Sequence, residues 1–127
     1  MFELVRTGER VTGLASGIDR AHLEKLQRGE PAPDRELDLH GLTVAESRED
    51  VAFELGDAWH EGERCVRIIT GRGGHSPLGP VLRDAVIGWL QEPPIGDRVM
   101  AFASAPSSLG GSGAILVLLR RRRARTS

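Results

Sequence analysis

The 127-residue sequence contains no tyrosine, and its three phenylalanines and two tryptophans make up only 4% of the chain. Nucleic-acid bases stack on aromatic side chains, so this scarcity argues against recognition through base-stacking platforms. Cysteine occurs once, at Cys65, which excludes an internal disulfide bond. Because Cys65 lies inside an apolar run, we expect a small buried thiol with a structural role.

Long apolar runs are also missing. No segment reaches the roughly 18 consecutive apolar residues that a membrane-spanning helix needs. The first ten residues, MFELVRTGER, are too polar for the core of a signal peptide. We therefore expect a cytoplasmic protein without a membrane partner, and a monomer by default.

The charge is nearly balanced overall, at −1, but it is unevenly distributed. Five of the six residues from 120 to 125 are arginine, and the remainder of the chain is acidic. Such a run is either a solvated tail or a place where polyphosphate is held non-specifically. We assign residues 121–127 to a basic C-terminal tail.

The length fits one domain with a core of ordinary size. The first eighteen residues show no regular periodicity and contain three glycines, so we expect them to lie on the surface or to be partly disordered. Asp19 can cap a short helix over RAHLEKLQRG, which Gly29 ends. With the proline linker that follows, residues 1–33 are predicted to form an N-terminal helical extension.

The pattern changes at ELDLH, where Leu37 and Leu39 alternate with Asp38 and His40 as in a short strand. A capping box then opens an amphipathic helix that runs to residue 62. RCVRIIT predicts a buried strand, and a second helix follows the glycine loop, with Ser76 as its cap and Pro77 in its first turn. RVMAFASA and GAILVLLR predict two more strands, joined by the glycine-rich turn PSSLGGS.

This order of elements predicts a two-layer α/β sandwich over residues 34–120. The first three strands should run parallel through right-handed crossovers, and the fourth should be antiparallel because a hairpin adds it. The prediction is therefore a four-stranded mixed sheet (β-α-β-α-β-β) with both helices packed on one face.

Two polar motifs are expected to meet at the carboxyl edge of this sheet. Asp38 and His40 share a face where the first strand ends, and the stretch TGRGGHSPLGP leaves the second parallel strand at the same edge. Glycines let backbone N–H groups approach an oxyanion, and a helix N-terminus downstream adds favourable partial charge. Arg72 could pair with a phosphate, and His75 could transfer a proton or bind a metal.

The loop is neither a Walker motif nor G-x-G-x-x-G, so no nucleotide or organic cofactor is expected. Simpler explanations stay open for each residue. A strand-end Asp or His can merely cap the following turn, and the glycines can merely permit tight turns.

Three blocks of the sequence, LDLHGLTVAES, ITGRGGHSPLGPVLRDAV and RVMAFASAPSSLGGSGAILVLL, resemble the signature blocks of the Smr (small MutS-related) domain. The resemblance covers roughly residues 34–120 and is to the stand-alone form with an N-terminal extension. It implies a mixed α/β sandwich similar to the C-terminal domain of a bacterial translation initiation factor. It also implies nucleic-acid binding and, for several members, an endonuclease activity that nicks DNA or cuts RNA, with a divalent metal in some of them.

The resemblance further implies a role for two of the motifs. The L-D-x-H block at residues 37–40 is the family's presumed catalytic element. The T-G-x-G block at residues 70–73, with His75 after it, is linked to activity or substrate contact. This chain departs from the pattern at Gly74, where relatives often carry a bulkier residue, and has Arg72 where lysine is also frequent.

We therefore predict an endonuclease of low sequence specificity that cleaves phosphodiester bonds in RNA or DNA. Asp38 would orient His40 or bind Mg²⁺ or Mn²⁺, and His40 and His75 would serve as base and acid. RNA can use its own 2′-hydroxyl as nucleophile, whereas DNA would need a metal-activated water. The predicted substrate contacts are Thr70, Gly71, Arg72, Gly73, Gly74, Ser76, Gly111 and Gly113.

Two rival functions stay open. The first is a non-catalytic module that recognises a nucleic-acid backbone or a branched structure, with an affinity that falls steeply with salt. The second is an enzyme acting on a small phosphate compound.

Overall fold

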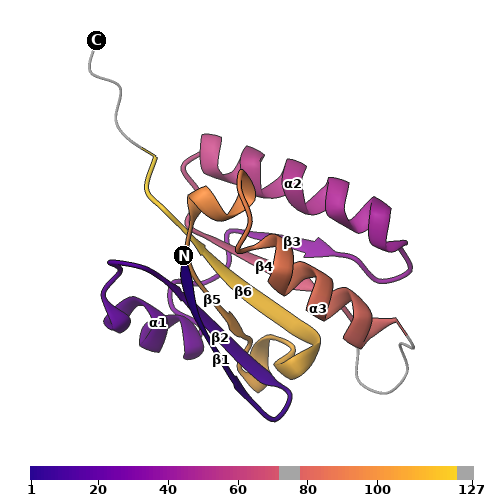
Figure 1. Ribbon diagram of the computed structural model, residues 1–127, viewed down its shortest axis with the longest axis horizontal. Coiled ribbons are helices and arrows are strands. Elements are labelled where there is room, and N and C mark those ends of the chain that lie inside the picture. Colours follow the sequence, from indigo (N-terminus) through magenta and orange to yellow (C-terminus); the bar gives the residue numbers. More distant parts are fainter. Residues whose placement is uncertain (72–77, 123–127) are drawn as a thin grey trace.

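The computed structural model describes residues 1–71 and 78–122, and these form one mixed sheet with helices on both faces (Figure 1). The strands are β1 (Phe2–Thr7), β2 (Arg10–Ala15), β3 (Arg35–Asp38), β4 (Cys65–Ile69), β5 (Val99–Ser104) and β6 (Ala114–Leu119). The helices are α1 (Arg20–Gln27), α2 (Val44–His60) and α3 (Gly79–Trp89), with short 3-10 turns at η2 (Ile95–Arg98), η3 (Ser107–Leu109) and η4 (Gly111–Gly113). Within the described residues, the sheet has six strands in the order β1-β2-β5-β6-β4-β3.

The unit β3-α2-β4 is folded as its local pattern predicts. Leu37 and Leu39 are buried, while Asp38 and His40 between and after them are exposed. Thr43 caps α2 by accepting a hydrogen bond from the Glu46 N–H, and the Glu46 carboxylate accepts one from the Thr43 N–H. The hydrogen bond from the Thr43 backbone lowers the pKa of Glu46 below its ordinary value. The predicted capping box is therefore confirmed.

The strand directions also follow the prediction. β3 and β4 are parallel, and β6 is antiparallel to both of its neighbours, β4 and β5, so β5 runs in the same direction as β3 and β4. The hairpin strand β6 lies in the middle of the sheet, and all of its residues are buried. Its side chains alternate between the two faces, with Ile115, Val117 and Leu119 toward α2 and α3 and Leu116 and Leu118 toward α1.

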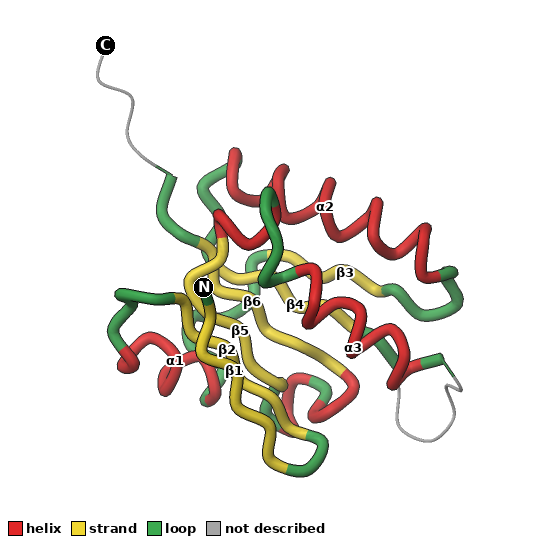
Figure 2. Tube along the Cα trace, viewed as in Figure 1, coloured by secondary structure: helices red, strands yellow, loops and turns green. Residues whose placement is uncertain are grey.

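The N-terminal segment differs from the prediction of a surface extension with only helical structure. β1 and β2 form an antiparallel hairpin, and β2 pairs with β5, so the sheet gains two strands beyond the predicted four (Figure 2). The sequence of β2 does not alternate regularly between apolar and polar residues, because the ring of Phe102 fills the space that a side chain at Gly13 would occupy. The sequence of β1 does not alternate either, because this edge strand exposes nearly all of its residues.

The predicted helix α1 is present, with Asp19 as its N-cap, but its position corrects the two-layer description. Figure 1 shows α2 and α3 on one face of the sheet and α1 on the other. Leu23 and Leu26 of α1 pack with Met100, Leu116 and Leu118, so a second apolar layer lies beneath α1. A central strand such as β6 is apolar on both sides because both of its faces must be covered.

The start of α3 also differs from the prediction. Its N-cap is Leu78, which makes no side-chain capping hydrogen bond, and Pro80 lies in the first turn. Ser76 and Pro77, predicted for these roles, lie outside the described residues.

The thiol of Cys65 is fully buried at the start of β4. Burial, with a smaller contribution from the nearby Asp34 carboxylate, raises the pKa of Cys65 to about 12. Since the thiolate is the nucleophilic form, this cysteine is inert near neutral pH, as expected for a structural residue. Among the helices of the described residues, none is both long and apolar enough to cross a membrane.

Candidate functional site

The two polar motifs begin side by side at the carboxyl ends of β3 and β4. Asp38 is the register partner of Ile69, and the Leu39 N–H donates to the Ile69 carbonyl at 2.9 Å. His40 therefore leaves β3 beside the point where Thr70 and Gly71 leave β4. We call this edge of the sheet, made by Asp38, His40, Thr70 and Gly71, the rim.

Asp38 and His40 are both exposed at the rim, and a hydrogen bond joins them. The Oδ1 atom of Asp38 accepts from the backbone N–H of His40 at 2.9 Å. This contact shapes the turn that leads into α2, so the simple capping role considered for Asp38 is realised. The contact uses the main chain of His40 and leaves its imidazole out of the bond, where solvent or a substrate can reach it.

Thr70 and Gly71 hold the rim to the loop that connects β5 and β6. The Gly113 carbonyl accepts from the Thr70 N–H at 3.0 Å, the Thr70 hydroxyl at 3.4 Å and the Gly71 N–H at 3.4 Å. The structure thus brings Thr70 and Gly71 against Gly113. Only 1% of Thr70 is exposed, so its side chain supports the rim and does not reach solvent.

The loop itself needs glycine. Gly111 has a φ of 58°, a left-handed conformation that side chains disfavour. Gly110, with a φ of 114°, has no room for a Cβ atom, which would lie 2.9 Å from the Cβ of Ala114. Gly111 is therefore explained by backbone geometry, and a role in substrate contact stays a prediction.

Arg83 is a basic residue near the rim that the sequence reasoning missed. Its Nη1 donates to the Ser112 carbonyl at 3.3 Å, and Ser112 adjoins the Gly113 carbonyl that holds Thr70. The Ser112 hydroxyl in turn donates to Glu9 in the β1–β2 turn at 3.3 Å. The sequence gives only a weak signal for Arg83, because it is one of two charged residues on α3 and only its contact with the loop distinguishes it.

The remaining predicted residues of the glycine loop, Arg72, Gly73, Gly74, His75 and Ser76, lie outside the described residues. Within residues 1–71 and 78–122, no group of three or more His, Cys, Asp or Glu side chains could hold a metal ion. Asp38 is the predicted metal ligand at the rim. An exposed carboxylate is a hard oxygen donor, and Mg²⁺ is commonly held by one or two carboxylates together with phosphate oxygens and water.

The order and spacing of these elements match a known family. A family model described as "Smr domain" matches residues 37–120. The chain belongs to the Smr domain family. The match begins within β3 and ends just after β6, so the hairpin β1–β2 and α1 precede the part that defines the Smr family.

Relatives of known name share this part of the chain. "Ribosome rescue factor SmrB" of Photobacterium profundum is 36% identical over 104 residues, which are 82% of this chain and 54% of that protein. The protein of the same name from Yersinia enterocolitica is 35% identical over 103 residues, with 81% and 54% covered. The chain thus spans about half the length of these relatives.

Solved Smr structures have the same fold. YdaL, a stand-alone small MutS-related protein from Escherichia coli, is 32% identical, with a TM-score of 0.73 and coverage of 87% of this chain and 82% of that chain. The Smr domain of Thermus thermophilus MutS2 is 37% identical, with a TM-score of 0.58. The match covers 98% of that domain but 68% of this chain, because the domain is shorter.

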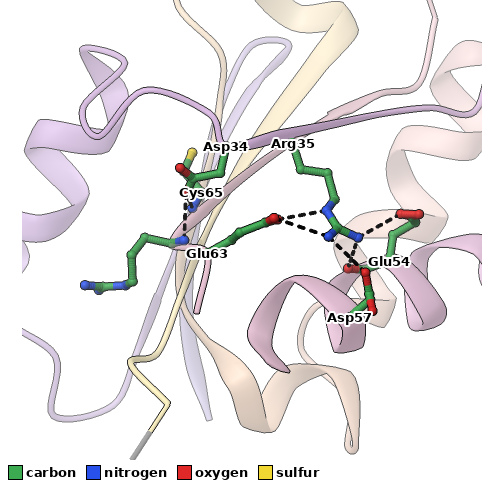
Figure 3. A network of polar contacts seen from close by, with 7 residues as sticks. Asp34, Arg35, Glu54, Asp57, Glu63 and Cys65 are labelled. Atoms are coloured by element: carbon green, nitrogen blue, oxygen red, sulfur yellow. Dashed lines mark hydrogen bonds and ion pairs between the residues drawn. The ribbon is translucent and has the colours of Figure 1, made fainter. Parts of the chain in front are cut away.

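In this Smr chain an ion-pair network holds the start of β3 against α2 (Figure 3). The guanidinium nitrogens of Arg35 lie close to the carboxylate oxygens of three acidic residues. The N–O distances are 2.8 Å to Glu63, 2.9 Å to Asp57 and 3.1 Å to Glu54. Its side chain is 18% exposed, and the hydrogen bond to Glu63 is the largest of the effects that raise its pKa. The residue before it, Asp34, accepts from the N–H groups of Arg64 and Cys65 at 2.7 and 3.1 Å. Both sets of contacts fix the strand that carries Asp38.

Replacing Arg35 tests this network. The Arg35→Met variant should lose about 1.5 kcal/mol of unfolding free energy, a value between those for exposed and buried ion pairs, because three carboxylates lose their shared cation. Urea denaturation measures the loss. Arg48→Met is the matched control, since Arg48 is exposed on α2 and makes no ion pair within the described part of the chain. Equal midpoints for the two variants would contradict a stabilising role for the network.

Proposed function

We propose that this Smr chain is an endonuclease that cleaves phosphodiester bonds with low sequence specificity, and that RNA is its substrate. The observation that carries the proposal is the rim, where the Asp38–His40 pair adjoins the start of the glycine loop at the ends of two parallel strands. In open α/β sheets, ligands collect at this edge. RNA is favoured over DNA because relatives that match most of the chain are named ribosome rescue factors, and ribosomes are built around RNA.

The chemistry assigned to the rim is proton transfer. The imidazole of His40 is exposed, and the hydrogen bond to Asp38 fixes the backbone from which it projects. An imidazole can both accept and donate a proton, so His40 can take a proton from the 2′-hydroxyl or give one to the leaving oxygen. His75 is proposed for the complementary role, and Arg72 with the loop amides for stabilising the charge that develops on the phosphate.

A divalent metal fits the donor at the rim. Mg²⁺ or Mn²⁺ would be held by Asp38 together with phosphate oxygens and water. When bound, such an ion would neutralise phosphate charge and make a coordinated water more acidic. The chain's own part is to present the Asp38 carboxylate, whose Oδ1 stays anchored to the His40 N–H.

The test is incubation of the purified protein with single-stranded, duplex and branched forms of RNA and DNA, each with Mg²⁺, with Mn²⁺ and with EDTA. Cleavage that is lost in EDTA assigns the reaction to a metal held at Asp38, and cleavage of RNA that persists in EDTA assigns it to a 2′-hydroxyl nucleophile acting with two histidines. A substrate with a 2′-deoxy sugar at the cleaved position should then stay intact. No cleavage of any nucleic acid under any of these conditions would contradict the proposal.

A second candidate function is backbone binding without catalysis. It is favoured by the capping hydrogen bond of Asp38, which gives this residue a structural reason to be present. The candidate predicts that labelled RNA is bound, with an affinity that falls steeply with salt, and stays intact. An RNA-directed role of either kind would place the protein in the cytoplasm, as we expect from the sequence.

A further inference from the structure

A groove with basic walls lies between α1 and the end of the sheet opposite the rim. Its volume is about 500 Å³, and its charged or titratable lining residues are His22, Lys25, Glu30, Arg64 and Arg121. They come from separate segments: α1, the linker after it, the residue before β4 and the chain after β6. We call this the basic groove.

Arg64 is the partly buried basic residue that lines the basic groove. Its Nε donates to the Leu119 carbonyl at 3.0 Å, and its Nη2 lies 3.3 Å from the Met100 sulfur. A guanidinium has five N–H donors, so most of them have no acceptor within the described residues. Burial and then the charge of Arg121 lower the pKa of Arg64, while Asp34 opposes this effect. Arg64 and Arg121 line the same groove, so two cations lie near each other there.

The balance of charge in the basic groove is positive. Lys25, Arg64 and Arg121 form no ion pair with any carboxylate in the part of the chain that the structure describes. The one acidic lining residue, Glu30, lies 3.7 Å from Arg28, which is not among the lining residues. Arg67, the next basic residue along β4, is already paired with Glu36. The groove therefore gathers more basic than acidic side chains on a chain whose net charge is −1.

The basic groove and the rim lie at opposite ends of the same strand. Arg64 precedes β4 and Thr70 follows it, and six steps at the usual strand rise separate them by about 20 Å. The rise of a duplex is about 3.4 Å per base pair along each strand, so this distance corresponds to about six base pairs. An extended polymer of phosphates can contact both places, whereas a single phosphate group can contact only one.

We propose that the basic groove is a second phosphate-binding site, which holds the sugar–phosphate backbone of a nucleic acid whose reacting bond lies at the rim. This inference rests on the proposed function, because it takes the nucleic-acid substrate from that proposal. It adds a contact that the rim motifs do not supply. Guanidinium and ammonium groups suit phosphate oxygens, and such contacts set position along the backbone without reading sequence.

The test uses the double variant Lys25→Gln/Arg121→Gln, because both side chains are exposed and their loss should leave the fold intact. Binding of labelled single-stranded RNA and of a labelled duplex is measured over a range of salt concentrations. Log affinity falls with log salt, and loss of two phosphate contacts should make this slope less steep, by about 1.4 for the single strand and about 1.8 for the duplex. Affinity itself should fall about tenfold.

Matched controls separate the groove from general loss of charge. Arg48→Gln removes one exposed charge from α2, on the other face of the sheet, and should leave the slope almost unchanged. A dinucleotide, which cannot reach from the rim to the groove, should be cut equally well by the parent and the double variant. A slope for the double variant equal to that of Arg48→Gln would overturn the groove proposal.

Three further outcomes show which proposal fails. If the slope falls as expected but no nucleic acid is cut, the groove stands and catalysis at the rim fails. If the parent protein binds no nucleic acid at all, both proposals fall. If the double variant loses affinity for inorganic tripolyphosphate by the same factor as for RNA, the groove takes free polyphosphate and the assignment to a nucleic-acid backbone is overturned.

Discussion

The His40→Ala variant is expected to cleave RNA about 10²- to 10⁴-fold more slowly than the parent protein, the usual contribution of one positioned acid–base group. The structure makes this a clean substitution. Asp38 is held by the backbone N–H of His40 at 2.9 Å, and alanine keeps that N–H. The imidazole is exposed, so its removal leaves no cavity. Initial rates on a gel, at saturating RNA, measure the effect.

Control variants separate the effect of losing the imidazole on the cleavage rate from other effects of the substitution. His60→Ala removes another exposed imidazole, at the end of α2, and should cleave at the parent rate. Asp38→Asn keeps an oxygen that accepts from the His40 N–H but removes the negative charge, so it separates turn capping from metal binding or imidazole orientation. If His40→Ala cuts as fast as the parent protein, His40 has no part in the reaction.

The Gly13→Ala variant is expected to lose about 2 to 3 kcal/mol of unfolding free energy through overpacking. A Cβ atom at this position would lie 2.2 Å from Cζ and 2.4 Å from Cε2 of the Phe102 ring. Phe102 is fully buried, and the ring of Phe2 lies against it with centroids 5.8 Å apart, so the ring cannot simply swing aside. β2 would have to move away from β5, and denaturant midpoints would report the cost.

Two comparisons make this prediction specific. Gly88→Ala places the same methyl group on α3, where a Cβ meets nothing within 4 Å, and should stabilise the protein by about 0.5 to 1 kcal/mol. The double variant Gly13→Ala/Phe102→Leu should recover part of the loss, since leucine gives the new methyl group space and the two residues are in contact. Full stability of Gly13→Ala alone would show that the hairpin is only loosely attached to the sheet.

The elements from β3 to β6 were predictable because their signals are local. The alternation around Leu37 and Leu39, the capping box at Thr43 and Glu46, and the unbroken apolar run of β6 each lie within a few neighbouring residues. The N-terminal hairpin has no such signal. β1 is an exposed edge strand, and Gly13 interrupts the pattern of β2 for a reason that lies far away in the sequence, at Phe102.

The rim was predictable for a related reason. Parallel strands joined by a helix end at the same edge of a sheet, so Asp38 and Thr70 had to lie near each other once β3 and β4 were recognised. The basic groove could not be foreseen in this way. Lys25, Arg64 and Arg121 line one groove but are far apart in the sequence. Nothing in the sequence around each of them distinguishes it from an ordinary charged surface residue.

By itself, the sequence determined the order of elements from β3 onward, the strand directions, the capping of α2 and the residues that gather at the rim. Each of these depends on periodicity or on the chirality of a crossover, and both act over short stretches of chain. Only the tertiary structure decided that the hairpin extends the sheet, that α1 covers the opposite face, that Thr70 is buried against Gly113 and that three distant cations share one groove. These features arise from contacts between separate segments, and such contacts leave no periodic trace in the sequence.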